Sequence, residues 1–168
     1  LQITSFRNIE SASMAPADSI NIILGPNGAG KSSILEAISV LAHGRSFRTS
    51  KFRRLINDEK LQFTLFGQLE DSLGSVDVPV GIQRDRSGKT DIKLAGRKVK
   101  SSAELALHLP LLVLNTHSFA LLEGSPKDRR RFFDWLVFHV KHQFADSWRH
   151  LQRCIKQHNS LLRRDKIT

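Results

Sequence analysis

The stretch Gly25-Pro26-Asn27-Gly28-Ala29-Gly30-Lys31-Ser32 decides the fold. It matches the phosphate-binding loop pattern G-x-x-x-x-G-K-[ST] at every fixed position. Its three glycines let the backbone turn tightly with its N–H groups pointing inward, which makes an anion nest at the start of a helix. The pattern therefore predicts a loop that binds the phosphates of a nucleotide.

The residues on either side of the loop support this prediction. Residues 19–24 form a nearly continuous apolar run, which is typical of a buried parallel strand and leads into the loop. After the loop, apolar residues recur with helical spacing and predict a helix that begins at Lys31 and ends near Gly44. In that geometry Lys31 neutralises phosphate oxygens and the Ser32 hydroxyl holds Mg²⁺, so we expect a nucleoside triphosphate with Mg²⁺.

The charge of the chain favours a polyanionic partner. The 168 residues include 26 Lys and Arg against 16 Asp and Glu, and the resulting excess of +10 lies after residue 40. A basic surface near a nucleotide site favours DNA or RNA, although solvated charged faces alone also produce such an excess. The sequence has no signal peptide and no apolar run of about 18 residues, so we expect that nothing spans or crosses a membrane. A single cysteine, Cys154, fits a reducing cytoplasm.

A basic stretch follows the predicted helix. Between residues 45 and 54 there is no acidic residue, Phe47 and Phe52 interrupt the polar sequence, and the positive side chains are Arg45, Arg48, Lys51, Arg53 and Arg54. Two interpretations stay open. Either the stretch binds a nucleic-acid backbone while a phenylalanine stacks on a base, or the phenylalanines anchor a surface loop whose arginines are merely solvated.

The periodicity of the remaining segments changes along the chain. Residues 1–6 alternate like a half-buried strand, and residues 61–94 alternate like an antiparallel three-stranded meander with turns at 71–74 and 85–88. Residues 98–100 are a candidate addition to this meander. Residues 101–109 predict a short helix, and the apolar run 111–114 predicts a second buried parallel strand. His117 follows that run, and two interpretations stay open for it: a group near the γ-phosphate or a polar loop residue.

Helices are expected after residue 124. Ser125 is a suitable cap, Pro126 suits a first helical position and Asp128 favours the positive helix end. We expect the buried face of this helix to consist of Phe132, Phe133, Leu136, Val137 and Val140. A seam of period 3.5 then predicts a long helix packed lengthwise on another, through Phe144, Trp148, Leu151, Ile155, His158 and Leu162.

A second acidic site, which P-loop hydrolases use to activate water, is missing. Such a site usually ends an apolar run, and neither Asp58-Glu59 nor Glu70-Asp71 does so. A GTPase switch is one alternative, because Asp71-Ser72-Leu73-Gly74 matches D-x-x-G, but no Asn-Lys-x-Asp motif occurs. A small-molecule kinase and a DNA-binding module with an inactive nucleotide loop also stay open.

Several motifs together resemble the RecF family of bacterial DNA replication and repair proteins. The H-G-R-S-F-R and G-x-P-x-x-R-R-x-F-x-D-W stretches are more specific to that family than the phosphate loop, which thousands of ATPases share. The matching segments cover most of the chain: residues 6–9, 25–38, 43–48 and 124–135.

The resemblance implies an α/β P-loop NTPase of the ABC-ATPase type, related to structural-maintenance-of-chromosomes proteins. It implies ATP as the ligand, an ATP-dependent homodimer, and DNA binding in recombinational repair, replication and the SOS response. RecR and RecO are the implied partners, with RecA loading at gapped DNA as the outcome. On the same basis the nucleotide-binding residues are Arg7, Asn8, Gly25, Pro26, Asn27, Gly28, Ala29, Gly30, Lys31, Ser32 and Ser33.

The resemblance also implies how the chain is divided. We expect an ATPase core at 1–58, an antiparallel β subdomain at 59–110, a return strand at 111–124 and an incomplete helical lobe at 125–168. Thr116-His117 departs from the proline and acidic residue that many family members have at this point. The family's signature motif and acidic strand end are absent, so we assign no catalytic residue and expect weak ATP binding with little or no hydrolysis.

Overall fold

The computed structural model describes residues 1–70, 77–99, 102–115, 118, 120–141 and 143–164. The chain divides into two compact units, Leu1–Val113 and Leu114–Thr168. The first unit contains the phosphate loop and a sheet with two helices. The second unit is helical.

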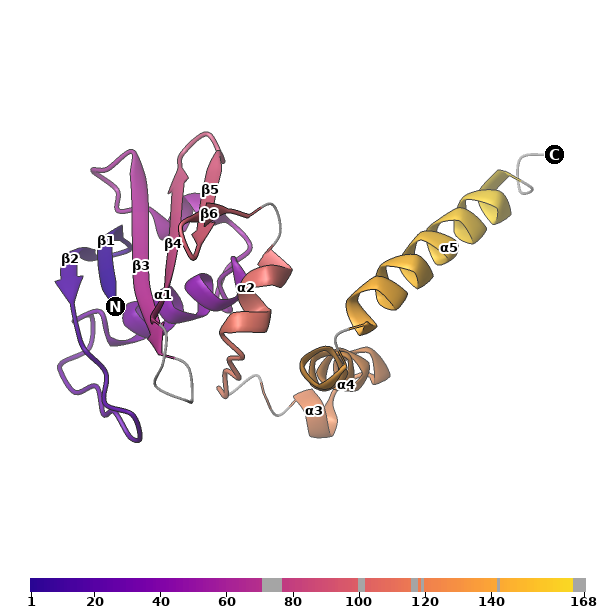
Figure 1. Ribbon diagram of the computed structural model, residues 1–168, viewed down its shortest axis with the longest axis horizontal. Helices are drawn as coiled ribbons and strands as arrows, with labels where there is room; N and C mark the ends of the chain where they lie inside the picture. The colour runs from indigo at the N-terminus through magenta and orange to yellow at the C-terminus, as the bar shows by residue number, and fades with distance from the viewer. Residues whose placement is uncertain (71–76, 100–101, 116–117, 119, 142, 165–168) are drawn as a thin grey trace. The chain divides into compact units, whose positions relative to one another are not determined.

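Six antiparallel strands form one sheet in the first unit, in the order β2-β1-β3-β4-β5-β6 (Figure 1). The structure confirms the strand predicted at 1–6, the three-stranded meander and its turn at 85–88. Strand β6 forms part of the extension that was predicted at 98–100. Lys100 and the turn predicted at 71–74 lie outside the described residues. The hairpin from β1 to β2 was not predicted. The strands are β1 Gln2–Phe6, β2 Ile9–Ser13, β3 Gln62–Glu70, β4 Asp77–Asp85, β5 Thr90–Leu94 and β6 Arg97–Lys98.

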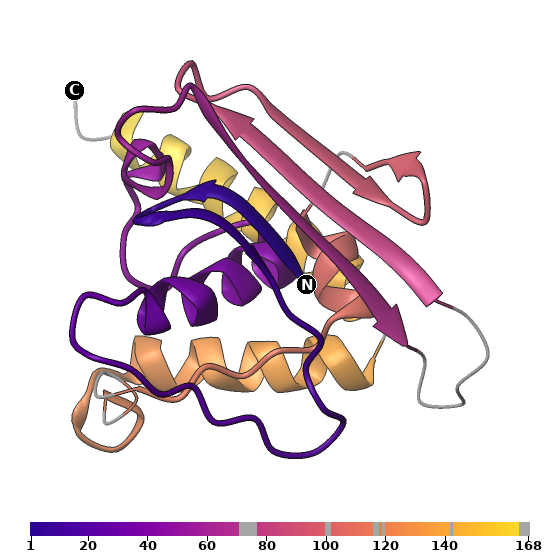
Figure 2. The same cartoon turned by 90° about the vertical axis from the view of Figure 1, so that its left-hand side faces the viewer.

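Helix α1, Lys31–His43, packs on one face of this sheet (Figures 1 and 2). Antiparallel pairing places Ile3 opposite Leu65 and Leu65 opposite Ile82, so that their side chains share the inner face. The rings of Phe6 and Phe63 meet edge to face with centroids 5.3 Å apart. Each fully buried large apolar side chain contributes about 1.5–3 kcal/mol, and this core fixes α1 below the strands.

Helix α1 begins and ends where the sequence predicts. Gly30 precedes it with φ of 96°, and Gly44 follows it with φ of 67° while donating from its backbone N–H to the Val40 carbonyl. Helix α2, Ser102–His108, confirms the short helix predicted at 101–109 and packs against α1. A 3₁₀ turn, η1 Phe52–Leu55, carries part of the basic stretch.

The two predicted parallel strands are wrong. Residues 19–24 and 111–114 form no strand, and Ile20, Ile22 and Leu24 are 80%, 77% and 85% exposed. A parallel strand requires hydrogen bonds along its edges and cover on both faces. No strand among the described residues pairs with either run, so their apolar sequences do not become β structure.

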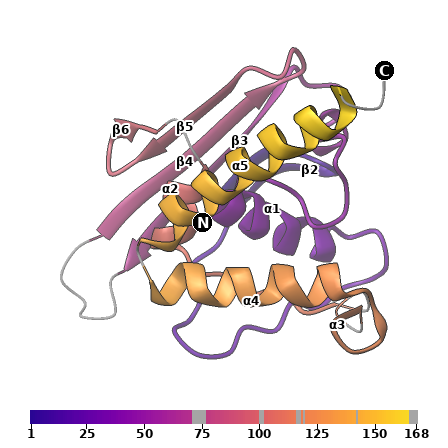
Figure 3. The same cartoon turned by 90° about the vertical axis from the view of Figure 1, so that its right-hand side faces the viewer.

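Helices α3 Ala120–Glu123, α4 Pro126–Val140 and α5 Phe144–Arg164 make up the second unit (Figure 3). The predicted helix start is confirmed: the Asp128 carboxylate accepts hydrogen bonds from the backbone N–H and the hydroxyl of Ser125. The hydroxyl bond is the main reason why the pKa of Asp128 lies below its ordinary value. Within the described ranges, no helix is both long and apolar enough to span a bilayer.

The predicted buried face of α4 is wrong. Phe133 and Val140 are 61% and 72% exposed, and none of the described side chains of α4 is fully buried. The long helix α5 is confirmed, but its apolar seam is exposed at Trp148 and Leu151, so the predicted lengthwise packing is not present among the described residues. Within the described part of the second unit neither face is buried, and periodicity predicts an apolar face without specifying what covers it.

The contact between Gly44 and α2 gives a test of this packing. A Cβ at Gly44 would lie 2.8 Å from the Ser102 Cβ, whereas a Cβ at Gly96, which also has positive φ, would meet nothing within 4 Å. We expect Gly44→Ala to lower the free energy of unfolding by at least about 2 kcal/mol, because overpacking adds to the backbone strain. Gly96→Ala, the matched control, should cost about 1 kcal/mol. Equal losses in chemical denaturation would show that α2 does not pack there.

Candidate nucleotide-binding site

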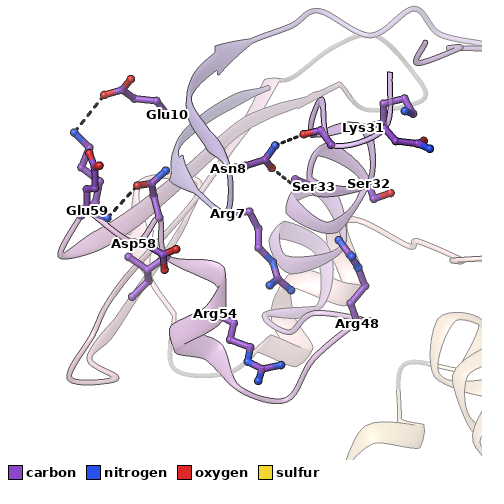
Figure 4. Close-up of a pocket in the computed structure, with 16 residues that line it drawn as sticks. Arg7, Asn8, Glu10, Lys31, Ser32, Ser33, Arg48, Arg54, Asp58 and Glu59 are labelled. Atoms are coloured by element: carbon purple, nitrogen blue, oxygen red, sulfur yellow. Dashed lines mark hydrogen bonds and ion pairs between the residues drawn. The ribbon is translucent and has the colours of Figure 1, made fainter. Parts of the chain in front are cut away.

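A pocket of about 990 Å³ lies beside the start of α1 (Figure 4). Its walls come from the phosphate loop, the β1–β2 turn, the basic stretch and residues 56–60, so segments far apart in the sequence meet there. The lining residues are Arg7, Asn8, Glu10, Asn27, Gly28, Gly30, Lys31, Ser32, Ser33, Arg48, Arg54, Ile56, Asn57, Asp58, Glu59 and Lys60.

The phosphate loop is folded around Lys31. Gly25, Gly28 and Gly30 have φ of 149°, 85° and 96°, a region of backbone space that favours glycine. The Lys31 ammonium donates to the carbonyl oxygens of Gly25 and Pro26, both at 2.7 Å. These two exposed bonds hold the charge over the loop, and the third ammonium donor is available to another acceptor.

Asn8 joins the sheet to the phosphate loop. Its side-chain amide donates to the Gly28 carbonyl at 2.7 Å, and its amide oxygen accepts a hydrogen bond from the Ser33 hydroxyl at 2.8 Å (Figure 4). A single side chain in the β1–β2 turn therefore contacts both the loop and the first turn of α1. This position fixes where the loop lies relative to the sheet.

Arg7, the neighbour of Asn8 in the turn, has a strained backbone. Its φ is 56°, which costs a residue with a side chain about 1 kcal/mol or more. The Arg7 backbone N–H donates to the Leu55 carbonyl at 2.8 Å, and its guanidinium forms two hydrogen bonds to the Glu36 carboxylate at 2.7 and 3.0 Å. These contacts hold the turn in its unusual conformation.

Glu36 was not predicted as a site residue. Its side chain has no exposed surface, yet it accepts hydrogen bonds from Arg7 and from the Ser46 hydroxyl, and its second oxygen lies 3.5 Å from the Arg48 guanidinium. The signal in the sequence is a carboxylate on the inner side of α1, between the buried positions Ser33 and Val40. A charged residue in such a stripe is rarely buried without a partner.

The wall across Asn8 from Lys31 carries carboxylates (Figure 4). The Arg86 guanidinium holds this wall by donating to the carbonyl oxygens of Asn57, Asp58 and Lys60 at 3.1, 2.6 and 2.8 Å. The side chains of Asp58 and Glu59 are therefore presented by a fixed backbone. Within the part of the chain that the structure describes, no group of three or more His, Cys, Asp or Glu side chains could hold a metal ion.

The basic stretch divides between the pocket and the outer surface. Arg48 and Arg54 line the pocket, while three residues are exposed outside its lining: Arg45, Lys51 and Arg53. The Arg84 guanidinium lies 4.0 Å from the ring centroid of Phe52. This contact favours the interpretation in which Phe52 anchors the stretch, since that ring face is already covered.

Most of the predicted nucleotide-binding residues meet in this one pocket. Gly25, Pro26 and Ala29 are not among the lining residues; the first two act through the carbonyl oxygens that hold Lys31. His117 lies outside the described residues. Glu36 and the wall around Asp58 are the parts that the sequence reasoning missed.

Comparisons with known proteins identify the family to which this chain is similar. The family model described as the RecF/RecN/SMC N terminal domain matches residues 1–119. The chain is 56% identical over its whole length to the DNA replication and repair protein RecF of Teredinibacter turnerae, and covers 44% of that protein. It is 54% identical to RecF of Saccharophagus degradans, over 99% of the chain and 45% of the relative. The chain thus spans less than half the length of these relatives.

Solved structures show the same fold. A structure of the recombination mediator protein RecF with ATP, in the RecFOR pathway, has a TM-score of 0.83 at 26% identity, covering 97% of this chain and 43% of its own. A structure from work on ATP-driven dimerization of SMC ATPases has a TM-score of 0.61 at 21% identity, covering 80% of this chain and 96% of its own. The fold is that of an ABC-type ATPase head, and the chain belongs to the RecF/RecN/SMC N-terminal domain family.

Proposed function

We propose that this chain binds ATP in the pocket beside α1, as the nucleotide-binding part of a DNA repair protein. One observation carries the proposal: Lys31 sits over a loop of three positive-φ glycines, and Arg7, Arg48 and Arg54 line the same pocket. With Lys60, five cations line the pocket against three carboxylates, those of Glu10, Asp58 and Glu59. This excess of positive charge at a glycine loop suits a polyphosphate better than a neutral ligand. The ATP complex of a RecF protein with the same fold supports the choice of ATP.

The residues of the pocket fit the parts of a triphosphate with Mg²⁺. The loop N–H groups and the Lys31 ammonium would bind phosphate oxygens, and Ser32, which lines the pocket, would offer its hydroxyl oxygen to Mg²⁺. When bound, Mg²⁺ would neutralise phosphate charge; no catalytic residue and little hydrolysis are proposed for this chain.

DNA is the proposed macromolecular partner. Arg45, Lys51 and Arg53 are exposed next to the pocket, so nucleotide and DNA sites would adjoin. We further propose that ATP stabilises a homodimer and thereby controls DNA binding by population shift. Action with RecR and RecO in RecA loading in the cytoplasm belongs to the same proposal, which the names of the relatives and of the RecF structure support. The division of the chain at residues 58, 110 and 124 is also proposed, on the motif resemblance alone.

The first test is nucleotide selectivity. Titration of fluorescent ATP and GTP with Mg²⁺ should show ATP binding to the chain and weaker GTP binding. Lys31→Ala should reduce ATP affinity at least about tenfold, because a charge-assisted contact contributes roughly 1.5–3 kcal/mol. Lys127→Ala, a substitution of the same type on α4, serves as control and should leave the affinity unchanged. GTP preference, or equal ATP binding by both variants, would contradict the proposal.

The second test concerns Asn8. Asn8→Ala removes the bond to Gly28 and the acceptor for Ser33, so the loop should lose its fixed position and ATP affinity should fall roughly 5- to 30-fold. Asn21→Ala is the matched control, because its amide bonds only within the neighbouring segment, at Ala17. Calorimetric titration at constant salt measures both. Unchanged affinity in Asn8→Ala would show that the turn does not position the loop.

The third test concerns DNA. Replacing both Arg45 and Lys51 by Ala should weaken binding to gapped DNA and reduce the slope of log affinity against log salt by roughly 1.5, the value for two lost phosphate contacts. ATP binding should stay the same, since neither residue lines the pocket. Replacing Lys89 and Lys93 on the meander by Ala removes the same charge and serves as control. Equal slopes for the two double variants would place the DNA contacts elsewhere.

A further inference from the structure

We propose that Glu36 is a positioning residue that orients Arg7 and Arg48 for nucleotide binding; this inference rests on the proposed ATP site. Glu36 itself does not line the pocket, whereas both arginines do. Its carboxylate is fully buried and contacts the two guanidinium groups, which come from the β1–β2 turn and from the basic stretch. One buried anion therefore connects two segments that reach the same phosphate site.

Glu36 fixes Arg7 rigidly. The guanidinium is bound through Nε and Nη2, which occupies one edge of the planar group and sets its direction. Arginine has five N–H donors, so the remaining donors are free of Glu36. Because the Arg7 backbone is also strained at φ of 56° and held by the Leu55 carbonyl, the whole residue is preorganised beside the phosphate loop.

Glu36 holds Arg48 mainly through its backbone, by way of Ser46, and only weakly through its side chain. The Ser46 hydroxyl donates to Glu36 and accepts from the backbone N–H groups of Arg48 and Thr49 at 2.8 and 3.0 Å. The backbone at Arg48 is thus fixed, while its side chain is 48% exposed and has one long 3.5 Å contact. A phosphate oxygen can replace that contact without any backbone change, so Arg48 is placed to exchange Glu36 for nucleotide.

Removal of the Glu36 carboxylate should change the affinity for a triphosphate in opposite directions, depending on whether its charge or its orientation of the two arginines matters more. Removing one negative charge near the pocket would strengthen the attraction of any anion if charge alone mattered. Losing the fixed geometry of the two arginines would instead weaken the binding of a triphosphate. Our proposal requires that orientation dominates, so the sign of the change separates the two roles.

The experiment measures MgATP and AMP binding to the full chain by calorimetry. Glu36→Gln should lower ATP affinity at least about tenfold and AMP affinity much less, because the triphosphate loses oriented charged contacts. Glu36→Asp keeps the charge but shortens the side chain, and should also lose ATP affinity because the carboxylate no longer reaches both guanidinium groups. An unchanged or increased ATP affinity in Glu36→Gln, or wild-type binding by Glu36→Asp, would overturn the inference.

A double-mutant cycle tests whether Glu36 acts through Arg48. The losses from Glu36→Gln and Arg48→Ala should combine to less than their product, since both remove one shared contact. Arg45→Ala is the matched control, with the same charge change in the same stretch but no contact with Glu36; its effect should multiply with that of Glu36→Gln. Full multiplication for Arg48→Ala as well would contradict the proposed route.

A milder substitution is the control for a loss of folding in Glu36→Gln. If Glu36→Gln fails to fold, Ser46→Ala removes one hydrogen bond to the buried carboxylate and the acceptor for the Arg48 and Thr49 N–H groups. It should lower ATP affinity about threefold or more. Unchanged ATP affinity in folded Ser46→Ala would then count against the inference. Lys31→Ala distinguishes a failure of the proposed ATP site from a failure of the proposed role of Glu36. If Lys31→Ala loses ATP affinity while the Glu36 and Ser46 variants keep it, the ATP site is supported and the role of Glu36 is contradicted.

Discussion

The turn at Arg7 and Asn8 connects the sheet to the phosphate loop, and the site depends on this connection. Asn8 bonds to Gly28 and Ser33, and Arg7 bonds to Glu36, so two adjacent residues hold both the loop and α1. Residues 19–24, which lead into the loop, form no strand, so among the described residues no sheet hydrogen bond holds that side of the loop. Without the turn, the glycines that shape the loop would leave it free to rearrange.

The charges of the pocket are arranged around this connection. The Lys31 ammonium contacts two loop carbonyls and Arg48 contacts the buried Glu36, so both cations have partners that an incoming anion can replace. Arg7 differs, because its guanidinium makes two hydrogen bonds to the buried Glu36, and we expect both to persist when a ligand binds. Arg7, Lys31 and Arg48 thus each have a partner in the empty site, so none of these three charges is unpaired before a polyanion binds.

The sequence predicted the local structure and much of the site, but not the long-range pairing. Gly30, Lys31 and Gly44 locate α1 because caps are local signals. The runs at 19–24 and 111–114 were predicted as strands from their apolar composition, yet strands need neighbours that composition does not identify. Glu36 was missed for the same reason: a carboxylate on an inner helix face has meaning only once Arg7 and Arg48 reach it from distant segments.

A structure of this chain determined with MgATP would test the central claim most directly. We expect the β- and γ-phosphates against the backbone N–H groups of residues 28–32, with the Lys31 ammonium moved from the Gly25 and Pro26 carbonyls to phosphate oxygens. The Asn8 contacts with Gly28 and Ser33 should persist. A nucleotide bound elsewhere, with Lys31 still on the two carbonyls, would contradict the assignment of this pocket.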